Sequence, residues 1–307
     1  MIGKRFIRGV LLAWGRWGRA PGYRYQFLDR HGAKLAEKEL LPAGLPNGCQ
    51  MLCDLRDHVQ RQIWFNGAYE PVETYLFSQL LQPGMTVLDI GANVGQYTLI
   101  ASTAVGPTGQ VHSFEPVPMT FARLKQHVEL NQLTNVTPTQ AALWMEETTL
   151  ELGLAEDQAD NVGSYSIGEA AAAPAKITAR AIRLRDYAEA HKLERLDLVK
   201  MDIEGAELFA LHGGRPLFER FRPVILMEVN RAALAKLETD PESLWRFVED
   251  MAYRAWRIGF SPETSGSIAN FDGLDQANIL LHVNSLPEAV TNGWNYRQVM
   301  QWARANR

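Results

Sequence analysis

Three charged residues alternate with apolar ones in the stretch "LDLVKMDIEGAE". Side chains two positions apart in a β-strand share a face, so Lys200, Asp202 and Glu204 would lie on one side of a strand. Charges in the middle of a sheet are costly unless they are paired, whereas ligands of parallel sheets bind beyond the carboxyl ends of the strands. We therefore predict that these three residues line a site, that Lys200 pairs with one of the acids, and that the carboxylates take a proton from a reacting group.

A second pattern, "VLDIGANVGQYTLI", has an apolar run that ends on Asp89 and a turn that contains Gly91, Asn93 and Gly95. A strand, a glycine turn and a helix start place free backbone N–H groups around a ligand. The turn lacks the GxGxxG pattern of dinucleotide sites, and a carboxylate at Asp89 suits a cationic ligand better than a pyrophosphate. Glu115 ends the next predicted strand, at the spacing expected for an acid that binds ribose hydroxyls. Together these residues predict a nucleoside with a cationic tail, which is S-adenosyl-L-methionine.

Strand and helix patterns alternate from about residue 69 onward, which is typical of a parallel sheet covered by helices on both faces. Pro138 predicts that the third strand lies at an edge of the sheet. The predicted strands are 86–91, 110–114, 135–143, 148–155, 176–184, 196–204, 223–230 and 277–283, and the predicted helices are 71–81, 96–105, 118–133, 185–193, 206–218 and 241–256.

The chain of 307 residues divides by character into three regions. We predict a basic and aromatic N-terminal extension (1–66) packed on the core, a catalytic domain (67–284) with an insertion at about 145–180, and a C-terminal tail (285–307). The N-terminal segment has the spacing of a basic amphipathic helix. We interpret it as a helix packed on the main domain, with contact between residues 1–20 and a membrane surface as the alternative.

The formal net charge of −4 argues against a partner that is nucleic acid. No apolar segment is long enough to span a bilayer, and the only cysteines, Cys49 and Cys53, suit a reducing compartment. We expect a cytoplasmic protein, with membrane association if the alternative for residues 1–20 holds. Its oligomeric state does not follow from the sequence.

The stretches "VLDIGANVGQYTL", "FEPVP", "LDLVKMDIEGAE" and "PVILMEVN", in this order, resemble the FkbM family of S-adenosylmethionine-dependent methyltransferases. The resemblance covers residues 70–283. It implies an α/β, class I methyltransferase (Rossmann-like) fold with a doubly wound, mostly parallel, seven-stranded sheet that has one antiparallel strand. It also implies O-methylation of a hydroxyl on a sugar, a glycan or glycolipid, or a natural product, so that the partner is a small-molecule or glycan acceptor.

The resemblance also assigns cofactor contacts by position. Asp89, Gly91, Asn93 and Gly95 would form the cofactor loop, and Glu115 would bind the ribose. Gln140 and Ala141, after the third strand, would line the adenine. Glu70, together with Glu73, would cover the methionine end, although an acid at the start of a helix also complements the helix dipole.

Several alternatives stay open for the chemistry. Glu207 and Glu228 could complete an acidic wall, with a helix-terminal role as the alternative for Glu207. The same acids could hold Mg²⁺. His212, before Gly213 and Gly214, is interpreted as a helix C-cap, with a catalytic role as its alternative.

Two other functional classes remain at this stage. An oxidoreductase linked to NAD or a nucleotide sugar would also use Asp89 and Glu115, but we expect GxGxxG for it. A non-catalytic binding protein could share the fold, although the cofactor loop is intact.

Overall fold

The computed structural model describes residues 2–17, 27–28, 30–36, 39–154, 165–170 and 173–306. Parts of the predicted N-terminal segment (18–20) and of the predicted insertion (155–164 and 171–172) lie outside the described residues.

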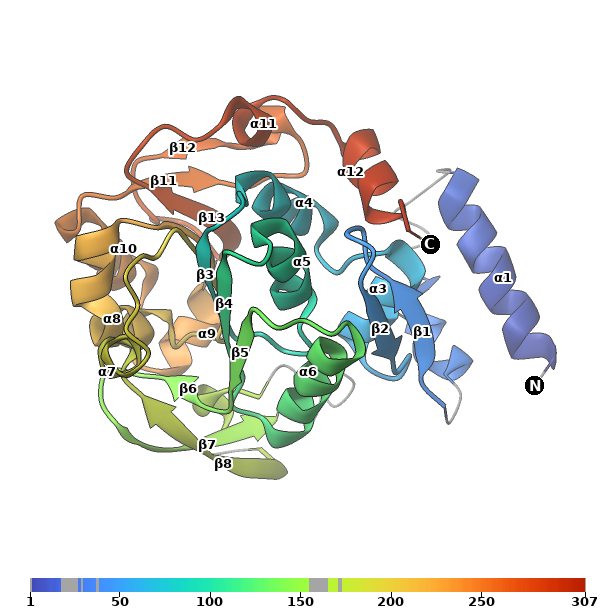
Figure 1. The fold of residues 1–307 in the computed structure, drawn as a ribbon, viewed down its shortest axis with the longest axis horizontal. Coiled ribbons are helices and arrows are strands. Elements are labelled where there is room, and N and C mark those ends of the chain that lie inside the picture. Colours follow the sequence, from blue (N-terminus) through green and yellow to red (C-terminus); the bar gives the residue numbers. More distant parts are fainter. Residues whose placement is uncertain are drawn as a thin grey trace.

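An eight-stranded sheet forms the centre (Figure 1), in the order β12-β11-β13-β10-β9-β3-β4-β5. Its strands are β3 (Thr86–Ile90), β4 (Gln110–Phe114), β5 (Val136–Thr139), β9 (Leu198–Met201), β10 (Val224–Asn230), β11 (Arg254–Arg257), β12 (Gly266–Ile268) and β13 (Gln276–His282).

Strands β5, β4, β3, β9 and β10 pair in parallel, while β13 is antiparallel to β10, β11 to β13 and β12 to β11. The predicted doubly wound, mostly parallel fold is thus confirmed. The sheet differs in detail from the expected seven strands with one reversed, because the short edge strand β12 adds an eighth strand and a second reversed one.

The helix predicted over 241–256 ends early, and β11 was not predicted from the sequence. Helix α10 spans Pro241–Asp250, and the next residues turn and pair with β13. Met251, Tyr253 and Ala255 are buried. Their spacing of two is the period of a strand, which the preceding helical pattern concealed.

Two groups of helices cover the sheet. Helices α7 (Leu184–Ala190), α8 (Glu207–Phe221) and α10 pack on the face that carries Val199, Met201 and Ile225. Helices α4 (Pro71–Leu80) and α5 (Gln96–Val105) pack on the face that carries Leu198 and Leu226. The central strands are apolar on both sides because both faces are covered. Helices α6 (Pro118–Leu130) and α9 (Arg231–Lys236) follow β4 and β10.

The strand predicted over 135–143 is two strands, β5 and β6 (Ala142–Leu143), with Gln140 and Ala141 between them. Strand β5 is an edge strand, as Pro138 predicts. Strand β6 leaves the main sheet and pairs with β8 (Ala175–Ile182), which pairs with β7 (Thr148–Leu154). A short turn of helix, η4 (Ile167–Glu169), packs on β7. This small sheet lies at the bottom in Figure 1.

The N-terminal elements are α1 (Ile2–Trp17), η1 (Gly32–Leu35), an antiparallel pair β1 (Leu41–Gly44) and β2 (Gln50–Cys53), and α3 (His58–Asn66). The C-terminal residues form α11 (Glu288–Thr291) and α12 (Tyr296–Ala303), after the short η5 (Pro262–Thr264) between β11 and β12.

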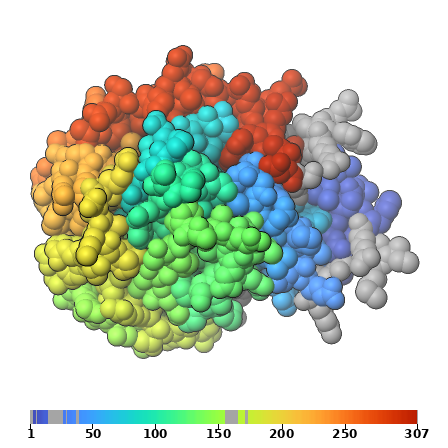
Figure 2. All heavy atoms as spheres, in the orientation of Figure 1, coloured from blue at the N-terminus to red at the C-terminus, as the bar shows by residue number. Residues whose placement is uncertain are grey.

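The N-terminal pair of strands and the C-terminal residues lie side by side (Figures 1 and 2). Asn306 Nδ2 donates a hydrogen bond of 2.6 Å to the Pro46 carbonyl. Gly67, at the end of α3, has φ +92°, and a Cβ there would lie 1.7 Å from the Ala303 carbonyl oxygen. Only glycine allows this approach.

Within the part of the chain that the structure describes, no helix is both long enough and apolar enough to cross a bilayer.

Candidate functional site

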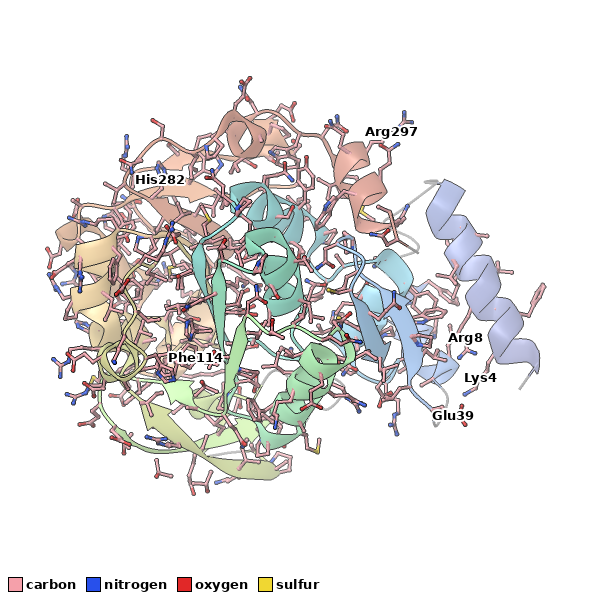
Figure 3. The ribbon with its side chains drawn as sticks, viewed as in Figure 1. Lys4, Arg8, Glu39, Phe114, His282 and Arg297 are labelled. Carbon is pink, nitrogen blue, oxygen red and sulfur yellow. The ribbon has the colours of Figure 1, made fainter. Side chains whose placement is uncertain are left out.

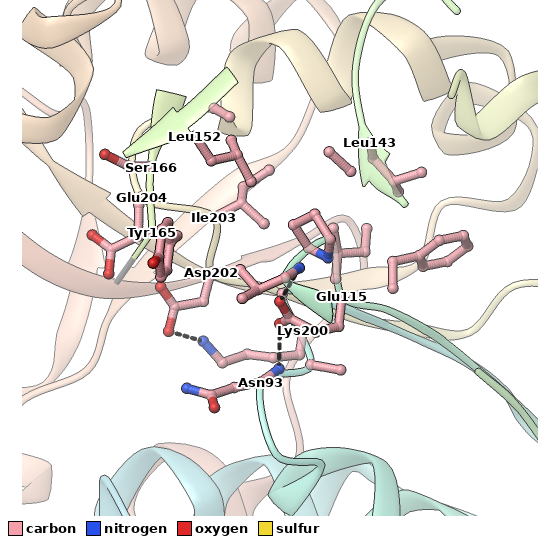
Figure 4. A pocket seen from close by; sticks show the side chains of 18 of the residues that line it. Asn93, Glu115, Leu143, Leu152, Tyr165, Ser166, Lys200, Asp202, Ile203 and Glu204 are labelled. Carbon is pink, nitrogen blue, oxygen red and sulfur yellow. Dashed lines mark hydrogen bonds and ion pairs between the residues drawn. The ribbon is translucent and has the colours of Figure 1, made fainter. Parts of the chain in front are cut away.

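A pocket lies at the carboxyl ends of β3, β4 and β9 (Figure 4). Its walls come from the turn after β3, the segment after β4, the residues around β6, the turn after β9, and Tyr165 to Ile167 beside β7. This is the edge at which open α/β sheets bind ligands.

The turn after β3 packs tightly on the turn after β9. Gly91 has φ +80°, and a Cβ on it would lie 1.9 Å from the Asp202 carbonyl oxygen. The N–H groups of Gly91 and Ala92 both donate to the Phe114 carbonyl, at 3.0 and 2.9 Å. Asn93 has φ +49°, and Gly95 starts α5. Gly91, Asn93 and Gly95 therefore form one cradle before the start of α5.

Glu115 is buried in the wall of the pocket. Its two carboxylate oxygens accept hydrogen bonds from the backbone N–H groups of Asn93 (2.9 Å) and Val117 (2.8 Å). Burial raises the pKa of Glu115 to about 7, although these bonds act in the opposite direction. A carboxylate has about four acceptor sites, so this side chain can also accept hydroxyl groups.

Asp89 lies beneath the loop and not in the lining of the pocket. Its Oδ2 accepts a 2.5 Å hydrogen bond from Thr98 Oγ1, which also contacts Ser113 Oγ at 2.6 Å. Its Oδ1 has no hydrogen-bond partner among the described residues. Burial raises the pKa of Asp89 to about 6 against the hydrogen bond from Thr98. The structure thus separates Asp89 from the other loop residues that the sequence places together.

The two residues predicted to line the adenine differ in position. Ala141 is buried and lines the pocket with Leu143. Gln140 is exposed and is not among the lining residues. The apolar side chains of Ile90 and Phe114 complete this end, which is the surface that a flat aromatic base requires.

Lys200, Asp202 and Glu204 all line the pocket, as predicted for this cluster. Strand β9 ends at Met201, so the two acids lie in the following turn, and Glu204 has φ +55°. The buried Lys200 Nζ lies 3.2 Å from Asp202 Oδ2 and 5.1 Å from the centre of the Tyr97 ring (Figure 4). Burial alone would lower the pKa of Lys200, but Asp202 and Glu70 outweigh it and raise that pKa. Lys200 is therefore a fixed positive charge and not a proton acceptor.

The carboxylate of Glu70 is attracted electrostatically by the ammonium group of Lys200, although Glu70 does not line the pocket. It precedes α4 with φ +44°, an uncommon conformation for a side chain of this kind. Its carboxylate accepts 3.5 Å hydrogen bonds from Tyr97 Oη and Asn278 Nδ2, and Asn278 also donates to Glu73 at 3.2 Å. Burial raises the pKa of Glu70 to about 8, while Lys200 lowers it.

The other two acids have structural partners. Glu207 Oε1 accepts bonds from the N–H groups of Ile203 (3.1 Å) and Gly205 (3.4 Å), so its side chain caps the turn at the start of α8. Glu228, on β10, accepts a 2.5 Å bond from Gln276 Nε2. Neither lines the pocket.

His212 lies outside the pocket lining, exposed in the middle of α8, with its ring 4.5 Å from that of Phe247. The predicted C-cap there is wrong, because α8 continues through Gly213 and Gly214 to Phe221. Gly213 packs against the Trp144 carbonyl. The glycine pair thus serves close packing and does not end the helix.

Gln96, Tyr97 and Tyr69 line the pocket but were missed at the sequence level. Gln96 Oε1 accepts the Tyr69 N–H at 2.7 Å, and its Nε2 donates to the Tyr69 carbonyl and to Thr74 Oγ1, both at 3.0 Å. The one available signal was position, since Gln96 and Tyr97 open the helix directly after the glycine loop. Tyr165 and Ser166 could not be found from the sequence, because they lie within the predicted insertion, far along the chain from the other residues of the pocket.

Among the described residues, no group of three or more His, Cys, Asp and Glu side chains has an arrangement that could hold a metal ion. The carboxylates around Lys200 neutralise an ammonium group instead. The Mg²⁺ alternative therefore has no support in this part of the chain.

The comparisons with known proteins agree with this geometry. The model of the methyltransferase FkbM domain matches residues 89–255, which is more than half of the chain. Methyltransferase 1 of Beauveria bassiana is 29% identical over 143 residues, covering 41% of this chain and 57% of that protein. The 31-O-demethyl-FK506 methyltransferase FkbM of Streptomyces tacrolimicus is 25% identical over 158 residues, covering 43% and 60%. The chain thus spans less than two thirds of these relatives' length.

A crystal structure of a methyltransferase FkbM from Methylobacillus flagellatus KT is 16% identical, with a TM-score of 0.41 over 69% of this chain and 48% of that one. The match to the FkbM domain model gives no support to the oxidoreductase alternative. A pocket with a glycine cradle, a buried acid and an apolar end fits S-adenosyl-L-methionine. The chain belongs to the FkbM family of methyltransferases, which depend on S-adenosyl-L-methionine.

Proposed function

We propose that this protein is an O-methyltransferase that acts on a hydroxyl group of a sugar, a glycan or glycolipid, or a natural product. The observation that carries the proposal is the pair formed by the buried Lys200 and the partly exposed Asp202, with Glu204 beside it, in the wall of the cofactor pocket. A relative named for an O-demethyl substrate supports the same kind of acceptor atom.

The cradle would hold the cofactor through groups of three kinds. The glycine turn and the side chain of Asn93 would contact the polar chain, Glu115 would bind the ribose hydroxyls, and Ala141 would leave room for the adenine ring. Glu70 remains our candidate for the methionine end, acting from behind Tyr97. When bound, S-adenosyl-L-methionine supplies an electrophilic methyl group on a positively charged sulfur.

Asp202 and Glu204 would accept the proton of the acceptor hydroxyl, which becomes a better nucleophile as it loses that proton. Lys200 cannot take the proton, because its own pKa is raised. Its ammonium group instead orients Asp202 at 3.2 Å and balances the negative charge. Alignment of the hydroxyl supplies the rest of the rate gain.

The cofactor half is tested by calorimetric titration with S-adenosylhomocysteine. We expect wild-type binding near the micromolar range, or about −8 kcal/mol. Glu115→Ala should weaken binding by about 1–3 kcal/mol, because charge-assisted hydrogen bonds are lost. Glu129→Ala, an exposed acid on α6, is the matched control and should bind normally. Absence of wild-type binding would leave only the non-catalytic alternative.

The catalytic half is tested by comparing extracts of a strain that lacks the gene with extracts of its parent. Purified enzyme and methyl-labelled cofactor are added to the deletion extract, and the labelled product is identified by mass spectrometry and NMR. We expect the label on oxygen. Label on nitrogen, carbon or a nucleic acid would contradict the proposal.

With that acceptor, Asp202→Asn and Glu204→Gln should lose about 10²–10⁴ in rate, mainly in kcat. Both variants should keep S-adenosylhomocysteine affinity within a few-fold. His212→Asn, a change outside the pocket lining, should turn over normally. Normal turnover by both acid variants would contradict the assignment of the base.

A further inference from the structure

Helix α1 packs on the protein through a mixed side that carries Lys4, Arg8 and the buried Leu11. Lys4 Nζ donates a 2.7 Å hydrogen bond to the Ala36 carbonyl, and the buried Arg8 donates one of 3.2 Å to the Leu35 carbonyl. The Arg8 guanidinium also lies 5.9 Å from the centre of the Trp64 ring. Figure 3 shows Lys4 and Arg8 on the side of α1 that faces the rest of the molecule.

The opposite side of α1 presents apolar side chains to solvent. Phe6 is 72% exposed, Ile7 42% and Val10 50%. Positions 6, 7 and 10 share a face of a helix. A surface helix normally turns its whole apolar stripe to the core, whereas α1 buries Leu11 but leaves these three side chains uncovered. Burial of Phe6, Ile7 and Val10 against another surface would therefore be favourable.

The charge of this region indicates which surface that is. Residues 1–26 contain six basic residues and no acidic one. Two of the six are engaged by carbonyl groups of the protein. A protein partner must match the polar groups at the rim of its interface, whereas lipid accepts an apolar helix face without directional bonds.

We propose that α1 docks the protein on an anionic membrane surface, with Phe6, Ile7 and Val10 inserted at the boundary between headgroups and acyl chains. The basic residues of 1–26 add attraction to anionic lipid, which is strong only within a Debye length of the surface. This proposal does not depend on the acceptor or on the catalytic residues.

The contact would hold the cofactor pocket close to the lipid. Helix α3 packs against α1 near Phe65, and Val59 at its other end lines the pocket. Six residues of helix span about 9 Å. Helix α1, about 10 Å across, lies between α3 and the lipid, so an acceptor carried in the membrane would have to extend on the order of 20 Å from the surface to reach the pocket.

Sedimentation with vesicles of phosphatidylcholine, with or without phosphatidylserine, tests the proposal on the full chain. The wild type should sediment with the anionic vesicles at low salt and be released by added salt. The variant Phe6→Ser/Ile7→Ser/Val10→Ser should bind about tenfold or more weakly. The control is Leu130→Ser/Met145→Ser/Phe260→Ser, which removes side chains that are 45%, 46% and 84% exposed elsewhere. It should sediment like the wild type.

Three results would overturn the proposal. The α1 variant could sediment as well as the wild type, or the control could lose binding equally. Alternatively, the wild type could ignore vesicles and instead self-associate in analytical ultracentrifugation, with the association lost in the α1 variant. A second copy of the chain would then cover this face. Circular dichroism and S-adenosylhomocysteine binding of each variant confirm that the domain is folded.

Discussion

The two halves of the pocket hold their carboxylates in opposite ways. Glu115, in the cofactor half, is fixed by backbone N–H groups of its own βαβ unit. Asp202, in the other half, is fixed by Lys200 of β9, and Glu70, outside the lining, is fixed by side chains that come from α5 and β13. The first half depends on local chain geometry, while the second depends on a single buried ammonium group.

This difference predicts different sensitivities. The cofactor half should fail when the backbone path changes, because its donors are main-chain groups. The other half should fail when its charge balance changes, because Lys200 faces several carboxylates at once.

The largest effect should come from Lys200→Met. The change removes the buried counter-ion of Asp202, whose side chain is 31% exposed, so the loss of unfolding free energy should stay below the about 3–5 kcal/mol of a fully buried pair. Urea denaturation measures the loss. Lys176→Met, at an exposed position of β8, is the control and should change stability by less than about 0.5 kcal/mol. If the two variants had similar urea denaturation midpoints, the second half of the pocket would not depend on the charge of Lys200.

Gly91→Ala and Gly106→Ala separate backbone strain from close packing. Both glycines have positive φ, but a Cβ at Gly106 meets nothing within 4 Å, whereas at Gly91 it meets the Asp202 carbonyl. Gly106, at φ +66° and ψ −170°, lies in a backbone region that is essentially restricted to glycine, so Gly106→Ala should cost about 1–3 kcal/mol of stability and leave cofactor affinity unchanged. Gly91→Ala should also lower S-adenosylhomocysteine affinity by about tenfold or more, since the cradle must shift. Equal affinities in calorimetry would show that the close approach is not required.

The smallest effect is a pH dependence set by Glu70. Burial raises its pKa in the folded protein from 4.5 to about 8, so folding favours the protonated form. Its contribution to stability is complete below about pH 4.5 and is lost as the pH rises toward 8. Glu70→Gln should flatten this decline by on the order of 1 kcal/mol or more, as measured by urea denaturation across that range. The pH profile of Glu73→Gln is measured for comparison, because burial also raises the pKa of the Glu73 carboxyl. An unchanged pH profile in Glu70→Gln would contradict the prediction.

The same comparison explains what the sequence could predict. The loop from Gly91 to Gly95 and the acid at Glu115 belong to one continuous strand, helix and strand, so local pattern is sufficient to group them. Period-two alternation grouped Lys200, Asp202 and Glu204, but the strand ends at Met201, so the two acids lie in the turn after it and not on a strand face. Tyr97 and Asn278 approach Glu70 only through tertiary packing, which leaves no local pattern.

The predictions for Asp89 and Gln140 differ from the structure for a common reason. Asp89 and Gln140 have the residue types of cofactor ligands, but Asp89 faces Thr98 beneath the loop and Gln140 faces solvent. Side-chain direction at the end of a strand depends on the turn that follows, which residue type does not specify.

Strand β11 was missed for a different reason. The helical pattern of α10 changes to a strand pattern within a few residues, so the predicted helix was drawn too long.

The contact of the C-terminal residues with the N-terminal pair of strands has a consequence for synthesis. The bond between Asn306 and Pro46 joins residues 260 positions apart. At about 5–20 residues per second, a ribosome needs roughly 10–50 s to make the chain between them. During that time Gly67 and the end of α3 lack the backbone of Ala303 that later packs on them. The wall of the pocket at Val59 should therefore reach its final rigidity after the central sheet, making the nascent chain most vulnerable to proteases at its N-terminal end.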